Sequence, residues 1–192
     1  DMRDALTALV GDQAKGLSPN VVSRLKSEWA IEHAAWMKRD QAANRYVYWW
    51  ADGIHTGLRQ EEDARQCLLV IIGVTPDGRK ELVTLGDGLR ESKESWLDVL
   101  RDLVRRGLSA GPRLAVGDGA LGFWAALDEV YPETQRQRCW VHKTGNVLNA
   151  LPKSLQARAK ADLHEIWMAP TRAQAIAAFD HFVTTYGPTY PK

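Results

Sequence analysis

The pattern of apolar and polar positions in residues 1–45 predicts helix rather than strand. Ser18 followed by Pro19 is typical of a helix start, with the serine as N-cap and the proline in the first helical position. After it, apolar residues recur at spacings of three and four, the period of one face of an α-helix. These residues are Val22, Leu25, Trp29, Ala30, Trp36 and Met37. The composition becomes polar between Asp40 and Arg45, which indicates a linker.

From residue 46 the pattern becomes that of strands. Residues 46–52 are aromatic and β-branched and end on an acid, Asp52. Residues 67–74 form a continuous apolar run, which is typical of a strand buried on both faces. Residues 76–78, Pro-Asp-Gly, predict a turn because proline presets the bend and glycine accepts positive φ. Residues 80–85 are the expected hairpin partner.

Helices and strands then alternate. Ser92 is the expected N-cap of a helix that stops at Gly107. Its predicted apolar stripe consists of Trp96, Val99, Leu100, Leu103 and Val104. Residues 114–118 predict a short buried strand that again ends on an acid, Asp118. A helix over 120–130, a fifth strand over 135–140 and helices over 141–186, broken at Pro152 and Pro170, complete the chain.

Three strands, a helix, a strand, a helix, a strand and further helices give the ribonuclease H-like layout. The predicted fold is therefore α/β: a mixed sheet with flanking helices, a helical insertion after the fifth strand and an N-terminal helical segment. We expect an N-terminal helical segment over 1–45, a ribonuclease H-like core over 46–140 and a helical insertion region over 141–192. The helix after Ser18 is either the second helix of a helix-turn-helix or an ordinary packing helix.

Composition limits the class of protein. The 192 residues are 45% hydrophobic and 26% charged, as in soluble globular proteins. The net charge of +1 gives no overall field that attracts nucleic acid. Two cysteines make no disulfide framework, which favours a reducing, cytoplasmic setting, and no apolar stretch predicts a membrane span. Because the chain opens on Asp1 and stops soon after helical sequence, we expect a piece of a longer protein.

Asp52 and Asp118 are the first candidates for chemistry. Each ends a predicted strand, and in the predicted layout those strands are neighbours, so the carboxylates meet at one end of the sheet. Glycines beside both acids let a substrate backbone approach closely. Carboxylate oxygens suit Mg²⁺, and a pair of such ions supports phosphoryl transfer. The alternative is that each aspartate only caps the turn after it, since Asp-Gly is a common turn pair.

Two further features follow the fifth predicted strand. Cys139 and His142 have the spacing of zinc ligands, but a structural zinc needs four ligands and no second cysteine pair exists. We therefore expect no structural zinc there, a buried Cys139 thiol and a His142 ring near the active site, where contact with DNA phosphate is an alternative. Six cations without an intervening acid predict a phosphate-facing surface, the alternative being ordinary solvated surface. They are Arg136, Arg138, Lys143, Lys153, Arg158 and Lys160.

Several ordered stretches carry a resemblance to a known family. They are ADGIHTGLR, GVTPDGRKEL, RESKESWLDVLRDL, LAVGDGALGFWAAL and RQRCWVHKTGNVLNALPKS. From about Gly16 onward the chain resembles the bacterial insertion-sequence branch of the Mutator-like transposase superfamily. The resemblance implies that Asp52 and Asp118 are the first two members of a DDE triad, and that the family's Cys-x₂-His falls on Cys139 and His142. His142 is then an active-site residue.

The resemblance also implies an activity and partners. We expect strand cleavage and strand transfer that depend on Mg²⁺ or Mn²⁺, acting on double-stranded DNA at terminal inverted repeats and at a target, by a nucleoid-associated homodimer without membrane contact. The family's third acid has no counterpart: Glu129 and Glu133 follow Asp118 too soon, and Glu165 lies in the predicted insertion. We therefore expect that glutamate beyond Lys192 and an inactive fragment. The alternatives are a ribonuclease H-like nuclease or resolvase, and a domesticated DNA-binding derivative without catalysis.

Overall fold

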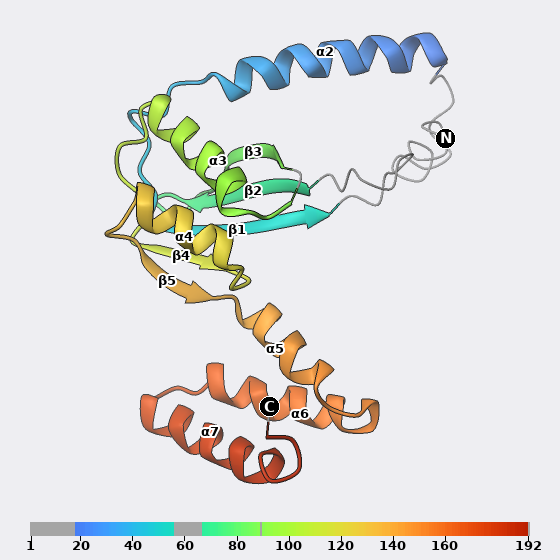
Figure 1. The fold of residues 1–192 in the computed structure, drawn as a ribbon, viewed down its shortest axis with the longest axis vertical. Coiled ribbons are helices and arrows are strands. Elements are labelled where there is room, and N and C mark those ends of the chain that lie inside the picture. The colour runs from blue at the N-terminus through green and yellow to red at the C-terminus, as the bar shows by residue number, and fades with distance from the viewer. Residues whose placement is uncertain (1–17, 56–66, 89, 192) are drawn as a thin grey trace. The chain divides into compact units, whose positions relative to one another are not determined.

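The computed structural model describes residues 18–55, 67–88 and 90–191 (Figure 1). By contacts between Cα atoms, the chain divides into two compact units. The first consists of residues up to 44 together with 102–109, and the second of residues 45–101 and 110–192. The division into three parts expected from the sequence remains a prediction.

A five-stranded mixed sheet forms the centre of the second unit. Its strands are β1 (Tyr48–His55), β2 (Cys67–Val74), β3 (Lys80–Gly88), β4 (Leu114–Gly117) and β5 (Gln135–Arg138). Their order is β3-β2-β1-β4-β5. Strand β1 is antiparallel to β2 and β2 to β3, while β4 is parallel to both β1 and β5. This order and these directions confirm the ribonuclease H-like fold predicted from the sequence.

The strand boundaries differ from the prediction at β1. The predicted strand 46–52 lies in the structure at Tyr48–His55, so Asp52 is within the strand and not at its end. Ladder pairing with β4 stops at Trp50, whereas pairing with β2 continues to His55. The antiparallel partner therefore keeps the chain extended through Asp52-Gly53, a dipeptide that by itself favours a turn.

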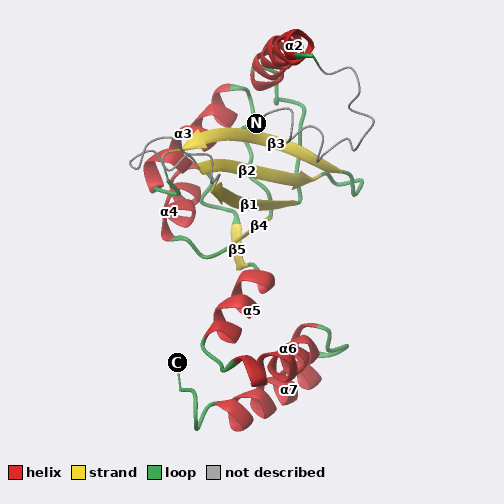
Figure 2. Cartoon of the chain, turned by 90° about the vertical axis from the view of Figure 1, so that its right-hand side faces the viewer, coloured by secondary structure: helices red, strands yellow, loops and turns green. Residues whose placement is uncertain are grey.

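Helices α3 (Lys93–Arg105) and α4 (Leu121–Val130) lie on one face of the sheet (Figures 1 and 2). The rings of Trp96 and Phe123 join the two helices, with centroids 4.8 Å apart. Ser92 caps α3, as predicted, by accepting a hydrogen bond from the Ser95 N–H at 3.1 Å. Gly107 has a φ of +97°, which fits its predicted role as helix stop. Val104 was predicted to belong to the buried stripe but is 44% exposed.

The other face of the sheet carries an exposed apolar row. Trp50, Ile72 and Leu82 are paired across β1, β2 and β3 and are each about two-fifths exposed, at 40%, 40% and 44%. The continuous apolar run of β2 was predicted to be buried on both faces, and this prediction is wrong for the described chain. Leu69 and Ile71 are fully buried beneath the helices, while Ile72 on the opposite face is not.

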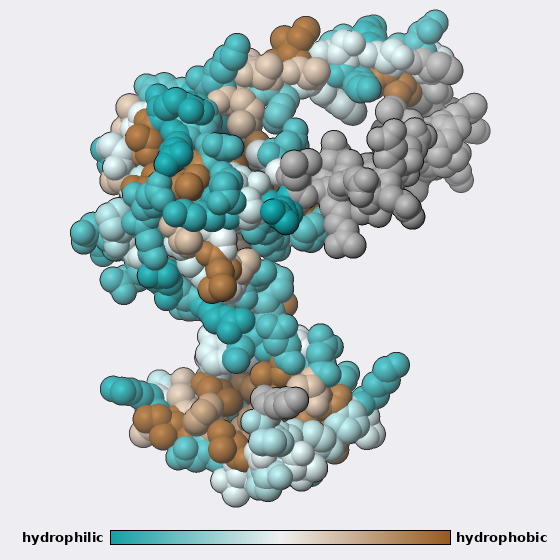
Figure 3. All heavy atoms as spheres, in the orientation of Figure 1, coloured by the Kyte–Doolittle hydropathy of each residue, from teal (hydrophilic) through white to brown (hydrophobic). Residues whose placement is uncertain are grey.

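Three helices follow β5: α5 (Trp140–Asn149), α6 (Lys153–Trp167) and α7 (Arg172–Tyr186). Leu151, Ala159 and Tyr186 form a small core among them. The Tyr186 hydroxyl donates to Asp162 of α6 at 2.7 Å. Apolar side chains also gather on the surface of these helices (Figure 3), including Phe179 at 54% exposure. Helix interruptions at Pro152 and near Pro170 match the prediction.

In the first unit, α2 (Pro19–Met37) begins as predicted, because Ser18 Oγ accepts a hydrogen bond from the Val21 N–H at 3.3 Å. The predicted apolar stripe is only partly covered: Trp29 is 55% exposed. Residues 1–17, also predicted helical, lie outside the described residues. Across the described part of the chain, none of the helices has the length and apolar character needed to cross a membrane.

Candidate active site at the carboxyl ends of strands β1 and β4

The register of β1 and β4, extended two residues beyond their last ladder pair, aligns Asp52 with Asp118. In the parallel ladder Tyr48 pairs with Leu114 and Trp50 with Val116. Two residues further along each strand, the same offset aligns Asp52 with Asp118. The two acids therefore lie toward the same edge of the sheet, just beyond the paired part of the two strands. Asp118 is the first residue after β4, as predicted.

Asp118 also shapes the turn into α4. Its Oδ1 accepts a hydrogen bond from the Ala120 N–H at 2.6 Å, and Gly119 between them has a φ of +101°. Only glycine adopts that conformation without strain. The turn-capping role considered from the sequence is therefore present at Asp118. It uses one of the two carboxylate oxygens and is compatible with metal binding through the other.

A third carboxyl group, Glu91, lies within electrostatic range of the two aspartates. A Cβ atom on Gly53 would collide with Glu91 Oε1, so the carboxylate rests directly over the backbone of Gly53, the residue after Asp52. On its other side, a Cβ on Gly122 would lie 2.7 Å from the backbone oxygen of Glu91. The Glu91 side chain is only 16% exposed. Two glycines thus admit the segment between β3 and α3 into the site.

The electrostatics of Glu91 reflect this crowding. Burial raises the pKa of the Glu91 carboxyl, and the negative charges of Asp118 and Asp52 raise it further. His55 and His142 oppose the shift and lower the same pKa. The His55 Nε2 atom lies 3.7 Å from Glu91 Oε1. The edge of the sheet therefore has a negative field that a bound divalent cation would neutralise.

We predict that Glu91→Gln stabilises the fold at neutral pH in the presence of a chelator. Because the folded-state pKa is raised, the folded protein favours the protonated carboxyl, and its ionisation costs stability above the ordinary carboxyl pKa of about 4.3. The glutamine should raise the midpoint of thermal unfolding at pH 7.5 by about 2–4 °C, the effect of about 1 kcal/mol. Circular dichroism melts should show this gain vanishing as the pH falls through the carboxyl range.

Glu94→Gln provides the matched control for that prediction. Glu94 is exposed in the first turn of α3, where hydrogen bonds from its own backbone N–H and from Ser92 lower its pKa. Its replacement should give no gain at neutral pH. Equal melting shifts for the two variants would show that Glu91 experiences no unfavourable field.

Cys139 and His142 lie where β5 passes into α5. The Cys139 N–H donates to the Gly117 carbonyl at 2.6 Å and precedes the first residue of α5. Its thiol is half-buried, not buried as expected. His142 lies in the first turn of α5 and is exposed, and its effect on the pKa of Glu91 places its ring within electrostatic range of the site.

The six predicted DNA-binding cations lie on three different elements. Arg138 of β5 reaches the candidate site: its guanidinium packs against Gly119 and donates to the Asp118 carbonyl at 3.4 Å. Arg136 forms an ion pair with Asp128 of α4 at 2.8 Å, so the run is not free of acids in space. The remaining four are exposed on α5 and α6: Lys143, Lys153, Arg158 and Lys160.

The glutamates considered from the sequence as a third acid take other positions. Glu129 pairs with Lys93 and Arg101 of α3 at 2.9 and 2.6 Å. Glu133 and Glu165 are exposed, the latter on α6. Sequence reasoning missed Glu91 because it stands just before a helix cap in a polar stretch, where local pattern indicates only a loop. The signal that could have identified Glu91 was its place directly before Ser92, the predicted N-cap of the helix that follows the third strand.

Comparison with known proteins identifies the family. Residues 1–192 match the family described as "Transposase, Mutator family". The chain is 58% identical over 198 residues to the transposase for insertion sequence element IST2 of Acidithiobacillus ferrooxidans, covering 100% of this chain and 64% of that protein. It is 50% identical over 192 residues to the transposase for insertion sequence element IS6120 of Mycolicibacterium smegmatis, covering 100% and 58%.

Among solved structures, the catalytic core domain of BIV integrase aligns with a TM-score of 0.31 and 10% identity, over 72% of this chain and 82% of that one. That likeness is too slight to support an argument about function. The chain spans 64% and 58% of the two transposases above. On the match over its whole length and on these identities, the chain belongs to the Mutator family of transposases.

Proposed function

We propose that this chain carries the catalytic centre of a DDE transposase of an insertion sequence, with Asp52 and Asp118 as ligands of Mg²⁺ or Mn²⁺. The observation that supports this most directly is the register of β1 and β4, which aligns the two aspartates at one edge of a ribonuclease H-like sheet. Membership of a transposase family supports the reaction class that we propose, which is cleavage of DNA strands and their transfer to a target.

The residues present fit such a metal. The charges of Asp118 and Asp52 both act on Glu91, whose pKa is raised first by burial and then by these two carboxylates. Hard oxygen donors are the ligands that Mg²⁺ prefers, together with water and substrate phosphate. The bound metal would supply activation of the attacking oxygen and stabilisation of the leaving one. Asp52 and Asp118 would hold it. The side chains of Glu91 and Arg138 occupy the space beside Gly53 and Gly119, so the close approach of a substrate backbone expected there from the sequence is not open at these glycines.

The cations near the site complement this role. Arg138 donates to the Asp118 carbonyl, and His142 lies within electrostatic range of Glu91. Both are proposed to contact the DNA backbone at the scissile phosphate. The exposed lysines of α5 and α6 are proposed to extend that contact along double-stranded DNA. Phosphate contacts of this kind position DNA without reading its sequence.

Neutralising three of these cations should weaken DNA binding without changing sequence preference. We predict that the combined variant Arg138→Gln, Lys143→Gln and Lys153→Gln loses affinity for terminal-repeat and unrelated DNA alike. Each lost phosphate contact should reduce the slope of log affinity against log salt by about 0.9. Fluorescence anisotropy at several salt concentrations measures both quantities. Arg136→Gln is the control, because that guanidinium is already paired with Asp128. Unchanged slope in the triple variant would identify the run as ordinary solvated surface.

The partners and setting of the whole protein are also proposals. Two transposon ends must be brought together, so we propose a homodimer acting on terminal inverted repeats and target DNA in the bacterial cytoplasm, at the nucleoid. We further propose that the family's third acid lies in sequence that the longer relatives have in addition. Residues 1–192 alone should then bind Mg²⁺ weakly at the aspartate pair and should not cut DNA.

An assay for cutting and joining tests the proposed function. A chain extended to the full length of its relatives is incubated with DNA carrying the element's terminal repeats, a target plasmid and Mg²⁺. Cleavage at the repeat ends followed by joining to the plasmid is the expected result. Cleavage without joining would identify a nuclease or resolvase instead. DNA binding without cleavage would identify a derivative that has lost catalysis.

A further inference from the structure

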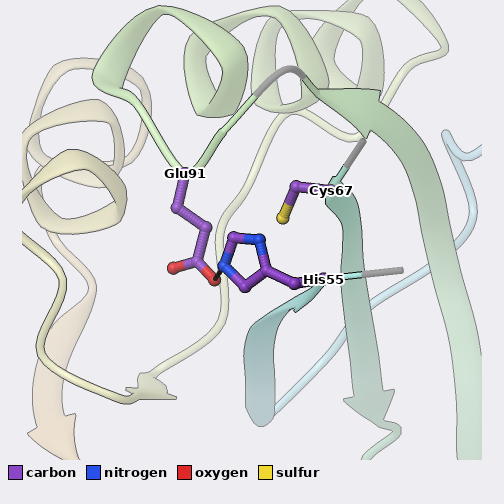
Figure 4. A group of neighbouring side chains, drawn as sticks. All are labelled: His55, Cys67 and Glu91. Atoms are coloured by element: carbon purple, nitrogen blue, oxygen red, sulfur yellow. Dashed lines mark ion pairs between the residues drawn. The ribbon is translucent and has the colours of Figure 1, made fainter. Parts of the chain in front are cut away.

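We propose that His55, Cys67 and Glu91 form a second metal site, separate from the aspartate pair, that binds a zinc-type transition-metal ion. One ligand atom from each side chain lies within 4.8 Å of the other two (Figure 4). The three side chains converge from β1, β2 and the segment between β3 and α3. This inference goes beyond the proposed transposase function and does not depend on it.

The sheet itself brings two of the ligands together. His55 and Cys67 are directly opposite each other in the antiparallel ladder of β1 and β2, at its last pair. Directly opposite residues project to the same face with Cβ atoms about 4.5–5.5 Å apart. On the other side of β2, Cys67 pairs with Gly88, the last residue of β3. The chain leaves the sheet at Gly88 and reaches Glu91 three residues later.

The third ligand is held in place by close packing. The carboxylate of Glu91 rests over Gly53 and its backbone carbonyl rests against Gly122, so a side chain at either glycine would displace it. Figure 4 shows the His55 ring between the Glu91 carboxylate and the Cys67 sulfur. Glu91 Oε1 lies 3.7 Å from His55 Nε2, which is within the span of two ligands on a common ion. The fold therefore holds Glu91 close to His55 and Cys67.

Exposure of the three side chains gives the site a closed and an open side. Cys67 is fully buried, Glu91 is 16% exposed and His55 is 60% exposed. A zinc ion bound by three protein ligands keeps a fourth position for water. The exposed side of His55 leaves room for that water and a path by which the ion enters.

The donor set selects the metal. A thiolate and an imidazole with one carboxylate suit Zn²⁺ or Co²⁺, whereas Mg²⁺ prefers oxygen donors alone. Binding replaces the thiol proton of Cys67, which passes to solvent. Among the described residues, Cys139 and His142 have no third histidine, cysteine or acid in a comparable group. The pair with zinc-like spacing in the sequence, Cys139 and His142, is therefore not part of the group of three ligands that the fold brings together.

Cobalt spectroscopy and zinc analysis on the purified chain test this site. After removal of metals by a chelator, titration with Co²⁺ should saturate at one ion per chain and give the near-ultraviolet charge-transfer band of a cobalt–thiolate bond. Dialysis against Zn²⁺ should leave one zinc per chain. Cys67→Ser should abolish the band, and His55→Ala should weaken zinc binding by at least the ~10-fold that loss of an outer-shell partner costs.

Matched variants separate this site from its surroundings. Cys139→Ser should keep the cobalt–thiolate band, because its thiol lies outside the cluster. Asp52→Asn should keep zinc binding while losing cleavage, so failure of the zinc site and failure of the proposed catalytic site are distinguishable. Should Cys67→Ser not fold, the surface change His55→Ala still decides the matter. Absence of a thiolate band in the unchanged chain, or its loss in Cys139→Ser, would overturn the proposal.

Discussion

Replacing Asp52 or Asp118 by asparagine should reduce Mg²⁺-dependent cleavage of transposon-end DNA at least about 1000-fold, the largest effect we expect from any single change. An amide keeps the shape of the side chain but is a poorer ligand for Mg²⁺. Register aligns both acids at the same edge, so loss of either removes half of the aspartate pair. Cleavage is measured on labelled terminal-repeat DNA with the chain extended to the length of its relatives.

DNA binding should change little in the same variants, because neither carboxylate donates a hydrogen bond to phosphate. Asp98→Asn is the matched control: Asp98 is exposed on α3, and its replacement should leave both cleavage and binding unchanged. Asp118 needs one further control, since its side chain also holds the turn to Ala120. Asparagine can accept the same hydrogen bond, so a folded Asp118→Asn variant that still cuts in Mg²⁺ would refute the assignment.

Local pattern was sufficient for most of the fold. Strand β2 lies at the predicted residues 67–74, and the caps at Ser18 and Ser92 hold as predicted. Each of these features is decided by residues within a few positions of one another: an apolar run, or a hydroxyl before a helix. The order of the elements then restricts the topology, because parallel neighbours such as β1 and β4 need a crossover between them.

Features decided by residues distant in sequence were not predictable in this way. Asp52 was expected at a strand end, but pairing with β2 continues β1 to His55. The basic run contains no acid in sequence, yet Asp128 reaches Arg136 from α4. The periodicity of nearby residues predicts neither the position of Glu91 over Gly53 nor the pairing of His55 with Cys67. The sequence therefore identified the two aspartates, whose role as metal ligands stays a prediction, and it missed Glu91.

Truncating Trp49 to alanine should destabilise the fold by about 3–5 kcal/mol, a large share of the 5–15 kcal/mol typical of a folded domain. Trp49 is fully buried in β1, and its ring meets that of Tyr131 edge-on at a centroid distance of 5.5 Å. Alanine would leave a cavity beneath the sheet whose close-packed surroundings relax only in part. Urea unfolding followed by circular dichroism measures the free-energy difference.

The adjacent tryptophan provides the control, because successive strand residues point to opposite faces. Trp50 is 40% exposed on the other face, and Trp50→Ala should cost much less than Trp49→Ala. The loss of stability in Trp49→Phe should lie between those of Trp49→Ala and Trp50→Ala. Phenylalanine loses no described hydrogen bond, since Trp49 Nε1 has no partner among the residues described. Similar losses for Trp49→Ala and Trp50→Ala would mean that the second face is covered in solution and that the exposed row Trp50, Ile72 and Leu82 is an interface.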